Sequence, residues 1–290
     1  GGGATVIIDA HHHLWDVSRR AYPWLEPPAL APIRRTFTLA DLRARTAAVG
    51  VDATVLVQTV SDVAETREFL TTAAASDGLI RGVVGWVDLT DPAVDACLAD
   101  LRAAPGGRRL VGIRHQAQDE PDPGWLARDD VIRGLRAVAA AGLVYDLLVL
   151  PHQLPAARAA VEQVPEGRFV LDHAAKPPIA SGALQPWEDE LRRLAAHPHV
   201  SCKLSGLVTE ADWQRWQPAD LRPYAEVVLD AFGPQRVMAG SDWPVCELAA
   251  TYERVWEATM NVVSGLSDDE RRDVLAGTAA RVYRLEAIAP

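Results

Sequence analysis

The amino-acid sequence predicts a single (β/α)8 barrel, and three observations support this fold class. Eight short apolar runs, rich in β-branched residues, alternate with segments of helical periodicity at a spacing of about thirty residues, as in βα units. Most of these runs are nearly continuous in apolar residues, as expected of parallel strands covered on both faces. No GxGxxG motif follows the first run, which disfavours the alternative of a doubly wound open sheet.

The elements follow one another regularly along the chain. The predicted strands are residues 5–13, 53–58, 80–89, 110–115, 143–149, 169–174, 200–206 and 237–244. The clearest helical segments lie between them at 39–50, 133–142 and 223–233, and each closes with a glycine, which is typical of a helix C-terminus. Near the end, Ser267 and Glu270 have the spacing of a capping box and predict one more helix. We expect residues 1–4 to be a flexible lead and residues 5–290 to form one domain.

Composition excludes several classes of function. The net charge is −10 and no basic cluster occurs, so a role on nucleic acid or on an anionic membrane is not expected. No apolar run is long enough to span a membrane, and no signal-peptide pattern precedes Val6. The three cysteines show no CxxC spacing and leave one thiol unpaired in any pairing, which favours free thiols in a reducing cytoplasm.

Polar residues gather where the predicted strands end, which is the face of such a barrel that carries the active site. Six of the eight histidines lie at or just after strand ends. The polar and aromatic residues at these ends, in strand order, are His11, His12 and His13; Gln58; Trp86 and Asp88; Arg114 and His115; Asp146 and His152; Asp172, His173 and Lys176; Lys203 and Ser205; and Ser241 and Asp242.

The histidine triplet has a simple geometric interpretation. Side chains alternate along a strand, so His11 and His13 share one side, and His12 faces the barrel–helix layer or a loop. By the same alternation Asp9 shares the side of His11, and we interpret it as a buried structural carboxylate bonded to backbone or to Lys203. Two imidazoles on one side can bind one divalent ion or polarise one carbonyl oxygen. Asp242 can either bind that metal or take a proton from an attacking water.

Other strand-end residues are candidates for binding a substrate. Arg114 and His115 face opposite ways because they are adjacent, and we favour Arg114 as the group that contacts an anion or a hydroxyl. Aromatic rings at a barrel mouth suit stacking against a sugar-like ring. The complete set of predicted substrate-binding residues is Arg114, Lys176, Gln58, Trp15, Trp86, Trp243, His115 and His152.

Several motifs resemble a known family. The segments DAHHHLWD, GIRHQAQDEPDPGWL, LDHAAKPPI, CKLSGL and MAGSDWPV occur in that order between residues 9 and 245. As a set they resemble the amidohydrolase-superfamily group of sugar-lactone and pyrone-lactone hydrolases, of the amidohydrolase-2 type. This resemblance implies a distorted (β/α)8 barrel that hydrolyses a lactone, such as L-fuconolactone or L-rhamnonolactone.

The resemblance also suggests roles for individual residues. His11 and His13 match the first-strand pair, His173 the sixth-strand histidine and Asp242 the eighth-strand aspartate. Binuclear members carry a bridging lysine or glutamate at the end of strand four, where this chain has Arg114 and His115, so a two-metal site is not expected. A fifth-strand ligand stays open, since His152 falls beyond the predicted strand. We expect one divalent metal, zinc, with metal-free catalysis by the histidines as the alternative.

The sequence thus leads to a mechanistic hypothesis. Asp242 accepts a proton from water, hydroxide attacks the lactone carbonyl, and the developing charge is stabilised by the metal or by His11 and His13, with His173 assisting. The partner is a small-molecule lactone, and the oligomeric state is not predicted. Two alternatives remain: a metal-dependent decarboxylase, for which Arg114 could read a carboxylate, and a non-catalytic barrel that binds a sugar acid.

Overall fold

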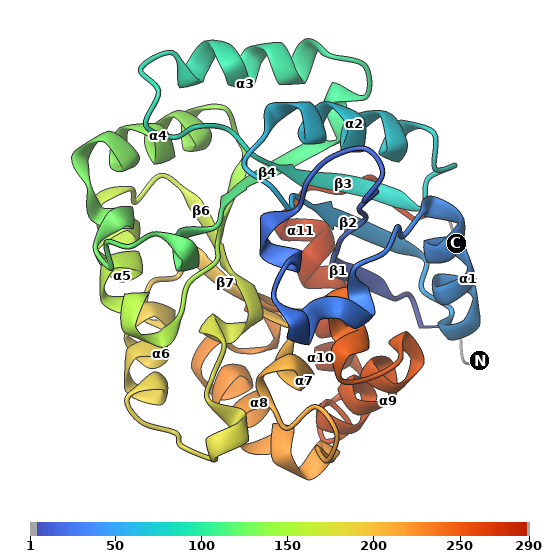
Figure 1. Ribbon diagram of the computed structural model, residues 1–290. Helices are drawn as coiled ribbons and strands as arrows, with labels where there is room; N and C mark the ends of the chain where they lie inside the picture. The colour runs from blue at the N-terminus through green and yellow to red at the C-terminus, as the bar shows by residue number, and fades with distance from the viewer. Residues whose placement is uncertain (1–4, 289–290) are drawn as a thin grey trace.

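The computed structural model describes residues 5–288 and confirms the predicted (β/α)8 barrel (Figure 1). Eight parallel strands form one sheet in the order β1 to β8, which is their order along the chain. The predicted lead, residues 1–4, lies outside the described residues. The strands are β1 (Ile8–His12), β2 (Ala53–Val57), β3 (Ile80–Gly85), β4 (Leu110–His115), β5 (Val144–Leu147), β6 (Arg168–Leu171), β7 (Val200–Leu204) and β8 (Val237–Ala239).

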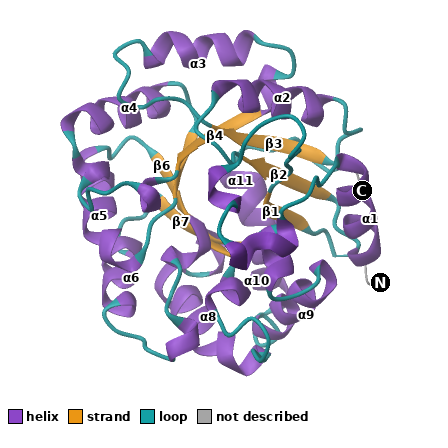
Figure 2. Ribbon diagram, in the orientation of Figure 1, coloured by secondary structure: helices purple, strands orange, loops and turns teal. Residues whose placement is uncertain are grey.

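Helices surround the strands (Figure 2), because the strands are buried and their outward-facing apolar side chains need cover. The capping box predicted at Ser267 and Glu270 is confirmed at the start of α10. Among residues 5–288 no helix is long and apolar enough to cross a membrane. The helices are α1 (Leu39–Val49), α2 (Val63–Ala74), α3 (Val94–Ala103), α4 (Asp129–Ala140), α5 (Leu154–Gln163), α6 (Trp187–Ala195), α7 (Leu207–Glu210), α8 (Pro218–Phe232), α9 (Tyr252–Val262), α10 (Asp268–Arg272) and α11 (Thr278–Val282).

The ring closes between the first and last strands, through residues that lie just beyond the short β8. The backbone N–H of Asp242 donates to the carbonyl of His11 (2.8 Å), and that of His13 donates to the carbonyl of Trp243 (2.7 Å). His12 and Trp243 form a parallel bridge. Barrel closure therefore brings the residues that follow β8 directly beside the histidines of β1.

The register of β1 shifts between Asp9 and His12, and this irregularity separates two side chains that simple alternation would place together. The Asp9 carboxylate accepts hydrogen bonds from the N–H and hydroxyl of Ser241 (2.9 and 2.5 Å) and from the hydroxyl of Tyr252 in the helical layer (3.0 Å). The ring of His11 instead contacts other partners, described below. The prediction that Asp9 shares the side of His11 was wrong, because a bulge adds one residue to the alternation. Its structural role is as predicted, since Asp9 accepts bonds from the backbone N–H groups of Ser241 and His11 and not from Lys203.

The C-terminal segment closes the other end of the barrel, and α11 lies within the ring of strands in the view of Figure 2. A π-helical turn, Asp273–Gly277, leads into α11, and Arg168 of β6 donates a hydrogen bond to the carbonyl of Val282. The side chains that point into the lower barrel form one apolar cluster with this segment: Ile8, Ala10, Ala53, Val55, Val57, Val84, Val144, Val170, Met238, Ala279 and Tyr283.

Several strands end earlier than predicted. The runs 80–89, 169–174 and 237–244 are extended only as far as Gly85, Leu171 and Ala239. The chain leaves the extended conformation in the left-handed region at His173, at φ +54°, and at Asp242, at φ +55°. Non-glycine residues rarely adopt these angles, so apolar periodicity could not indicate them.

A buried glutamate ties α2 to the end of β2. Glu65 accepts hydrogen bonds from the backbone N–H groups of Thr59 (2.8 Å) and Val60 (3.3 Å) and from the hydroxyl of Thr59. Burial raises the pKa of Glu65 from 4.5 to about 7, against the effect of those donors. The folded protein therefore holds this proton more tightly than the unfolded chain. The resulting stabilisation is complete below pH 4.5 and is lost as the pH rises through about 7.

We expect Glu65→Gln to reduce the decrease in unfolding free energy that the wild-type protein shows as the pH rises through about 7. Between pH 5 and pH 8 the wild-type protein should lose up to roughly 3 kcal/mol relative to the variant, because only the wild type must ionise a buried group. Urea unfolding at several pH values measures the difference. Parallel stability curves for the two proteins would contradict the assignment of this titration to Glu65.

Candidate active site

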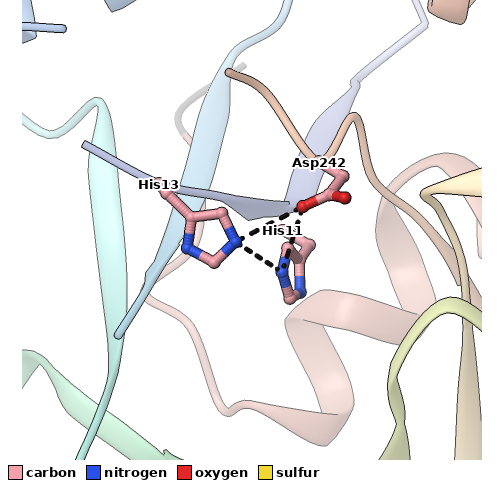
Figure 3. Close-up of side chains that lie close together, drawn as sticks. All are labelled: His11, His13 and Asp242. Atoms are coloured by element: carbon pink, nitrogen blue, oxygen red, sulfur yellow. Dashed lines mark hydrogen bonds and ion pairs between the residues drawn. The ribbon is translucent and has the colours of Figure 1, made fainter. Parts of the chain in front are cut away.

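Three side chains converge at the carboxyl ends of β1 and β8 (Figure 3). The Nε2 atoms of His11 and His13 are 3.1 Å apart, and the Oδ1 atom of Asp242 lies 3.6 Å and 3.3 Å from them. All three residues are buried. In a tetrahedral zinc site with bonds of 2.0–2.2 Å, two ligand atoms are separated by about 3.4 Å. The separations seen here are close to that value, so the donor set fits one divalent metal.

His173, from the turn after β6, completes the group. Its Nε2 lies 3.8 Å from Oδ1 of Asp242, and its ring centre is 4.4 Å from that of His11. The Nδ1 atom lies 2.7 Å from the hydroxyl of Ser205, which follows β7. The structure therefore brings together the four residues that the sequence predicted as catalytic or metal-binding groups.

Electrostatics keep the carboxylate of Asp242 ionised. Burial alone would raise its pKa, but the neighbouring His173, His13 and Lys176 outweigh that effect and lower it below 3.8. The Oδ1 atom is buried without a hydrogen-bond partner among the described residues. Burial lowers the pKa of His173 to about 4, against the attraction of Asp242 and Asp172. At neutral pH the site therefore holds a carboxylate beside a neutral His173, a combination suited to binding a cation or accepting a proton.

A layer of buried charges lies beneath the histidines. The ammonium group of Lys203 lies 2.7 Å from Asp146 and 3.3 Å from Asp172, and Arg114 lies 3.2 Å from Asp172. The Nζ atom of Lys203 is also 3.0 Å from Nδ1 of His11. Sequence analysis placed Asp146, Asp172 and Lys203 at strand ends but gave them no role in the site. The available signal was a charged residue within an otherwise apolar strand, which requires a buried partner.

The turn that carries His173 is left-handed over four successive residues. His173, Ala174, Ala175 and Lys176 have φ values of +54°, +50°, +61° and +54°. L-amino acids pay about 1–2 kcal/mol each for this conformation. The indole N–H of Trp187, at the start of α6, donates to the carbonyl of Ala174 (2.7 Å) and supports the turn from below. Such strain is typical of functional sites held by their surroundings.

Two of the predicted substrate-binding residues are bonded to each other. Arg114 donates to the side-chain oxygen of Gln58 (2.7 Å) and to its carbonyl (2.8 Å), and both residues are buried. Lys176 is half-buried, and its charge acts on both Asp242 and His173. Lys176 therefore adds positive charge to the electrostatic surroundings of the site, while Arg114 belongs to the charged layer with Asp172 and is bonded to Gln58.

The remaining candidates are spread around the barrel mouth. The indole of Trp86 donates to Nδ1 of His115 (2.9 Å), whose other nitrogen donates to Glu120 (2.8 Å). Trp15 and Trp243 are almost fully buried, and each ring packs edge-on against Phe37. His152 is exposed on the turn after β5. It belongs neither to the cluster of His11, His13 and Asp242 nor to a second cluster that could hold a metal ion, formed by His11, Asp172 and His173.

Comparison with known proteins agrees with this architecture. A family model described as amidohydrolase matches residues 8–285. The chain is 42% identical to an L-fucono-1,5-lactonase of Burkholderia multivorans, over 96% of each protein, and 40% identical to an L-fucono-1,5-lactonase of Burkholderia ambifaria, over 97% of each. A crystal structure of an amidohydrolase from Burkholderia multivorans with bound zinc has a TM-score of 0.89 and 41% identity, covering 97% of this chain and 100% of that one.

The chain is a (β/α)8 barrel of the hydrolase class, with a buried cluster of histidines and aspartate at the carboxyl ends of its strands. It belongs to the amidohydrolase family, and this confirms the family predicted from its motifs.

The support that Trp187 gives to the left-handed turn can be tested with a matched pair of tryptophans. Trp216 is similarly buried and donates a similar bond to the carbonyl of Ala249 (2.9 Å), away from the turn. We expect Trp187→Phe and Trp216→Phe each to lose about 1–3 kcal/mol of stability, because each leaves a carbonyl without its donor. Only Trp187→Phe should also reduce hydrolytic turnover, since only that carbonyl belongs to the turn carrying His173.

Urea unfolding and steady-state kinetics under folded conditions separate the two effects. Equal turnover in both variants would show that the turn keeps His173 in place without Trp187.

Proposed function

We propose that this chain hydrolyses the lactone of a sugar acid, of the L-fuconolactone or L-rhamnonolactone type. The observation that carries the proposal is the ionised, unpartnered Oδ1 of Asp242, which faces the imidazoles of His11, His13 and His173. A general base beside groups that can stabilise an oxyanion is what lactone hydrolysis requires. The relatives named L-fucono-1,5-lactonase support the same reaction and suggest the substrate class.

In the proposed reaction Asp242 accepts a proton from water as the water oxygen forms a bond to the lactone carbonyl carbon. The histidines stabilise the negative charge that develops on the carbonyl oxygen. The bond between that carbon and the ring oxygen then breaks, and the proton held by Asp242 passes to the departing ring oxygen. The product is the open hydroxy acid. At neutral pH its carboxyl group releases one proton, which makes the reaction measurable by acidification.

The metal ligands in this proposal are His11, His13 and Asp242, with His173 as a further ligand within reach. Their spacing and the unpartnered oxygen of Asp242 suit zinc, and soft or borderline nitrogen ligands favour zinc over magnesium or calcium. When bound there, the ion would act as a Lewis acid on the lactone carbonyl. A zinc-bound relative of 41% identity supports this choice.

Substrate recognition is assigned to the residues around the mouth. Lys176 is the best-placed cation for a hydroxyl or carboxylate of the substrate, since its charge acts on both Asp242 and His173. Trp86 and His115 form a joined aromatic surface on which a sugar ring can rest. Gln58, Arg114, Trp15 and Trp243 would act chiefly by holding these groups in position, and exposed His152 would contact only a substrate that extends over the β5 loop.

The alternatives receive less support. A decarboxylase of this kind needs an arginine free to bind a carboxylate at the mouth, whereas Arg114 is buried and bonded to Gln58 and Asp172. A non-catalytic barrel has no use for an ionised base beside three imidazoles. A cytoplasmic location is proposed because Cys97, Cys202 and Cys246 are free thiols.

Replacing the proposed base tests the mechanism directly. We expect Asp242→Asn to lower turnover of L-fuconolactone roughly 10³-fold or more, since general-base catalysis and charge stabilisation are both lost. Asp95→Asn, an exposed change on α3, should leave turnover unchanged. A pH-indicator assay measures both variants, and circular dichroism checks that they fold. Substantial turnover by folded Asp242→Asn would refute the role of this residue.

Metal removal distinguishes zinc-dependent hydrolysis from metal-free hydrolysis by the histidines. If zinc is required, prolonged chelation should abolish acid release from L-fuconolactone, and one equivalent of zinc should restore it. Metal analysis of each sample supplies the control. Full turnover at less than about 0.05 metal per chain would contradict the zinc requirement and leave carbonyl polarisation to the histidines.

A further inference from the structure

Lys203 makes a contact with the metal site that the proposed mechanism does not use. Its side chain is completely buried, and its Nζ atom lies 3.0 Å from Nδ1 of His11 and 2.7 Å from Oδ2 of Asp146. Asp172 is a second carboxylate partner at 3.3 Å. Asp146 and Asp172 are the carboxylate partners that a buried lysine side chain requires. The chain contains two lysines, and the other is Lys176.

This contact determines which nitrogen of His11 carries a proton. An ammonium group has donors and no acceptor, so at 3.0 Å the Nδ1 atom of His11 must accept the hydrogen bond. The other possible partner of Nδ1 is Asp172, whose Oδ2 atom is 3.7 Å away, too far for a hydrogen bond. A neutral imidazole that accepts at Nδ1 carries its proton on Nε2, which is the atom that faces His13 and Asp242.

The neighbouring histidine has the complementary arrangement. Nδ1 of His13 lies 2.8 Å from the carbonyl of Val57, which can only accept, so Nδ1 carries a proton, and in the neutral ring Nε2 then has the free lone pair. The Nε2–H of His11 then points to Nε2 of His13 at 3.1 Å. Without a metal, the two rings and Lys203 form one continuous chain of hydrogen bonds.

From this arrangement we infer that Lys203 is a positioning residue that holds His11 as the Nε2–H tautomer and thereby lowers the affinity of the site for a divalent metal. A metal bound to Nε2 would replace that proton, and His11 would then present either an Nδ1–H group or an imidazolate to the lysine. With an Nδ1–H group, two hydrogen-bond donors, those of His11 and Lys203, would face each other. An imidazolate would require His11 to lose a second proton. Histidine ligands more commonly donate their second nitrogen to a carboxylate or a carbonyl, as His13 does here.

The same chain of contacts extends to the bottom of the barrel. The hydroxyl of Tyr283, just after α11, donates to Oδ1 of Asp146 (2.7 Å), and the other oxygen of this carboxylate accepts from Lys203. Asp146 thus fixes the lysine between the C-terminal plug and His11. In the metal-free state His11 keeps an N–H donor aimed at the site, which suits polarisation of a substrate carbonyl. This inference rests on the metal site of the proposed function, but its first test does not depend on activity.

The first test is the histidine tautomer in the metal-free wild-type protein. Nitrogen-15 NMR of the full chain labelled at histidine distinguishes Nδ1–H from Nε2–H, and comparison with His11→Gln assigns the signal of His11. We expect the Nε2–H form for His11 and the Nδ1–H form for His13. An Nδ1–H form for His11 would overturn the inference. Absence of lactone turnover, with the expected tautomers, would count against the proposed function alone.

The second test compares zinc affinity by competition with a chromophoric chelator. Lys203→Met combined with Asp146→Asn removes one cation and one anion, so the net charge is kept and the donor to His11 is lost. We expect this double variant to bind zinc about 10-fold more tightly or better, with the His11 signal changed to Nδ1–H. The control, Lys176→Met, removes a nearby charge and should leave the His11 tautomer unchanged. Equal zinc affinity in the folded double variant and the wild type would contradict the role of Lys203.

Discussion

The site depends on how the barrel closes. A ring of eight parallel strands must join its last strand to its first, and here β8 is only three residues long. The junction is made by the backbone of the residues that follow it, where Asp242 donates to His11 and His13 donates to Trp243. Asp9 supports the junction with a buried carboxylate that accepts two hydrogen bonds from Ser241 and one from Tyr252. Because these hydrogen bonds join His11, His13 and Asp242, which are also the site residues, closing the barrel places the site residues together.

A charged layer divides the barrel interior into two parts. Below it, apolar side chains from the strands pack against Ala279 and Tyr283 of the C-terminal segment. Above it, the histidines and Asp242 face the mouth. The layer holds two cations, Lys203 and Arg114, and two carboxylates, so its formal charges balance. Burying these charges is favourable only with close pairing, and breaking one pair is expected to be strongly destabilising. The layer gives the histidines a rigid polar base that an apolar core would not supply.

Backbone strain is concentrated in the same region. His173 and Asp242 both have backbone angles in the left-handed region. All four residues of the turn from His173 to Lys176 have positive φ. The cost of such a turn is offset by contacts from outside it, including the bond from Trp187. The strained backbone aims His173 and Asp242 at the same point although they follow different strands. This is consistent with a site whose geometry is set before substrate arrives.

The sequence by itself determined the strand order, the fold class and the face on which the polar residues gather, because apolar periodicity and strand-end positions are local properties. Alternation also paired His11 with His13 correctly. Only the tertiary structure decided the rest. The bulge in β1 turns the Asp9 side chain toward the helical layer, and a left-handed turn orients His173. Arg114 is hydrogen-bonded to Gln58 and Asp172. The pairing of Lys203 with Asp146 and His11 joins residues 57 and 192 positions apart. Charged residues so distant in the chain meet only when the strands are in register, so local sequence patterns cannot predict these pairs.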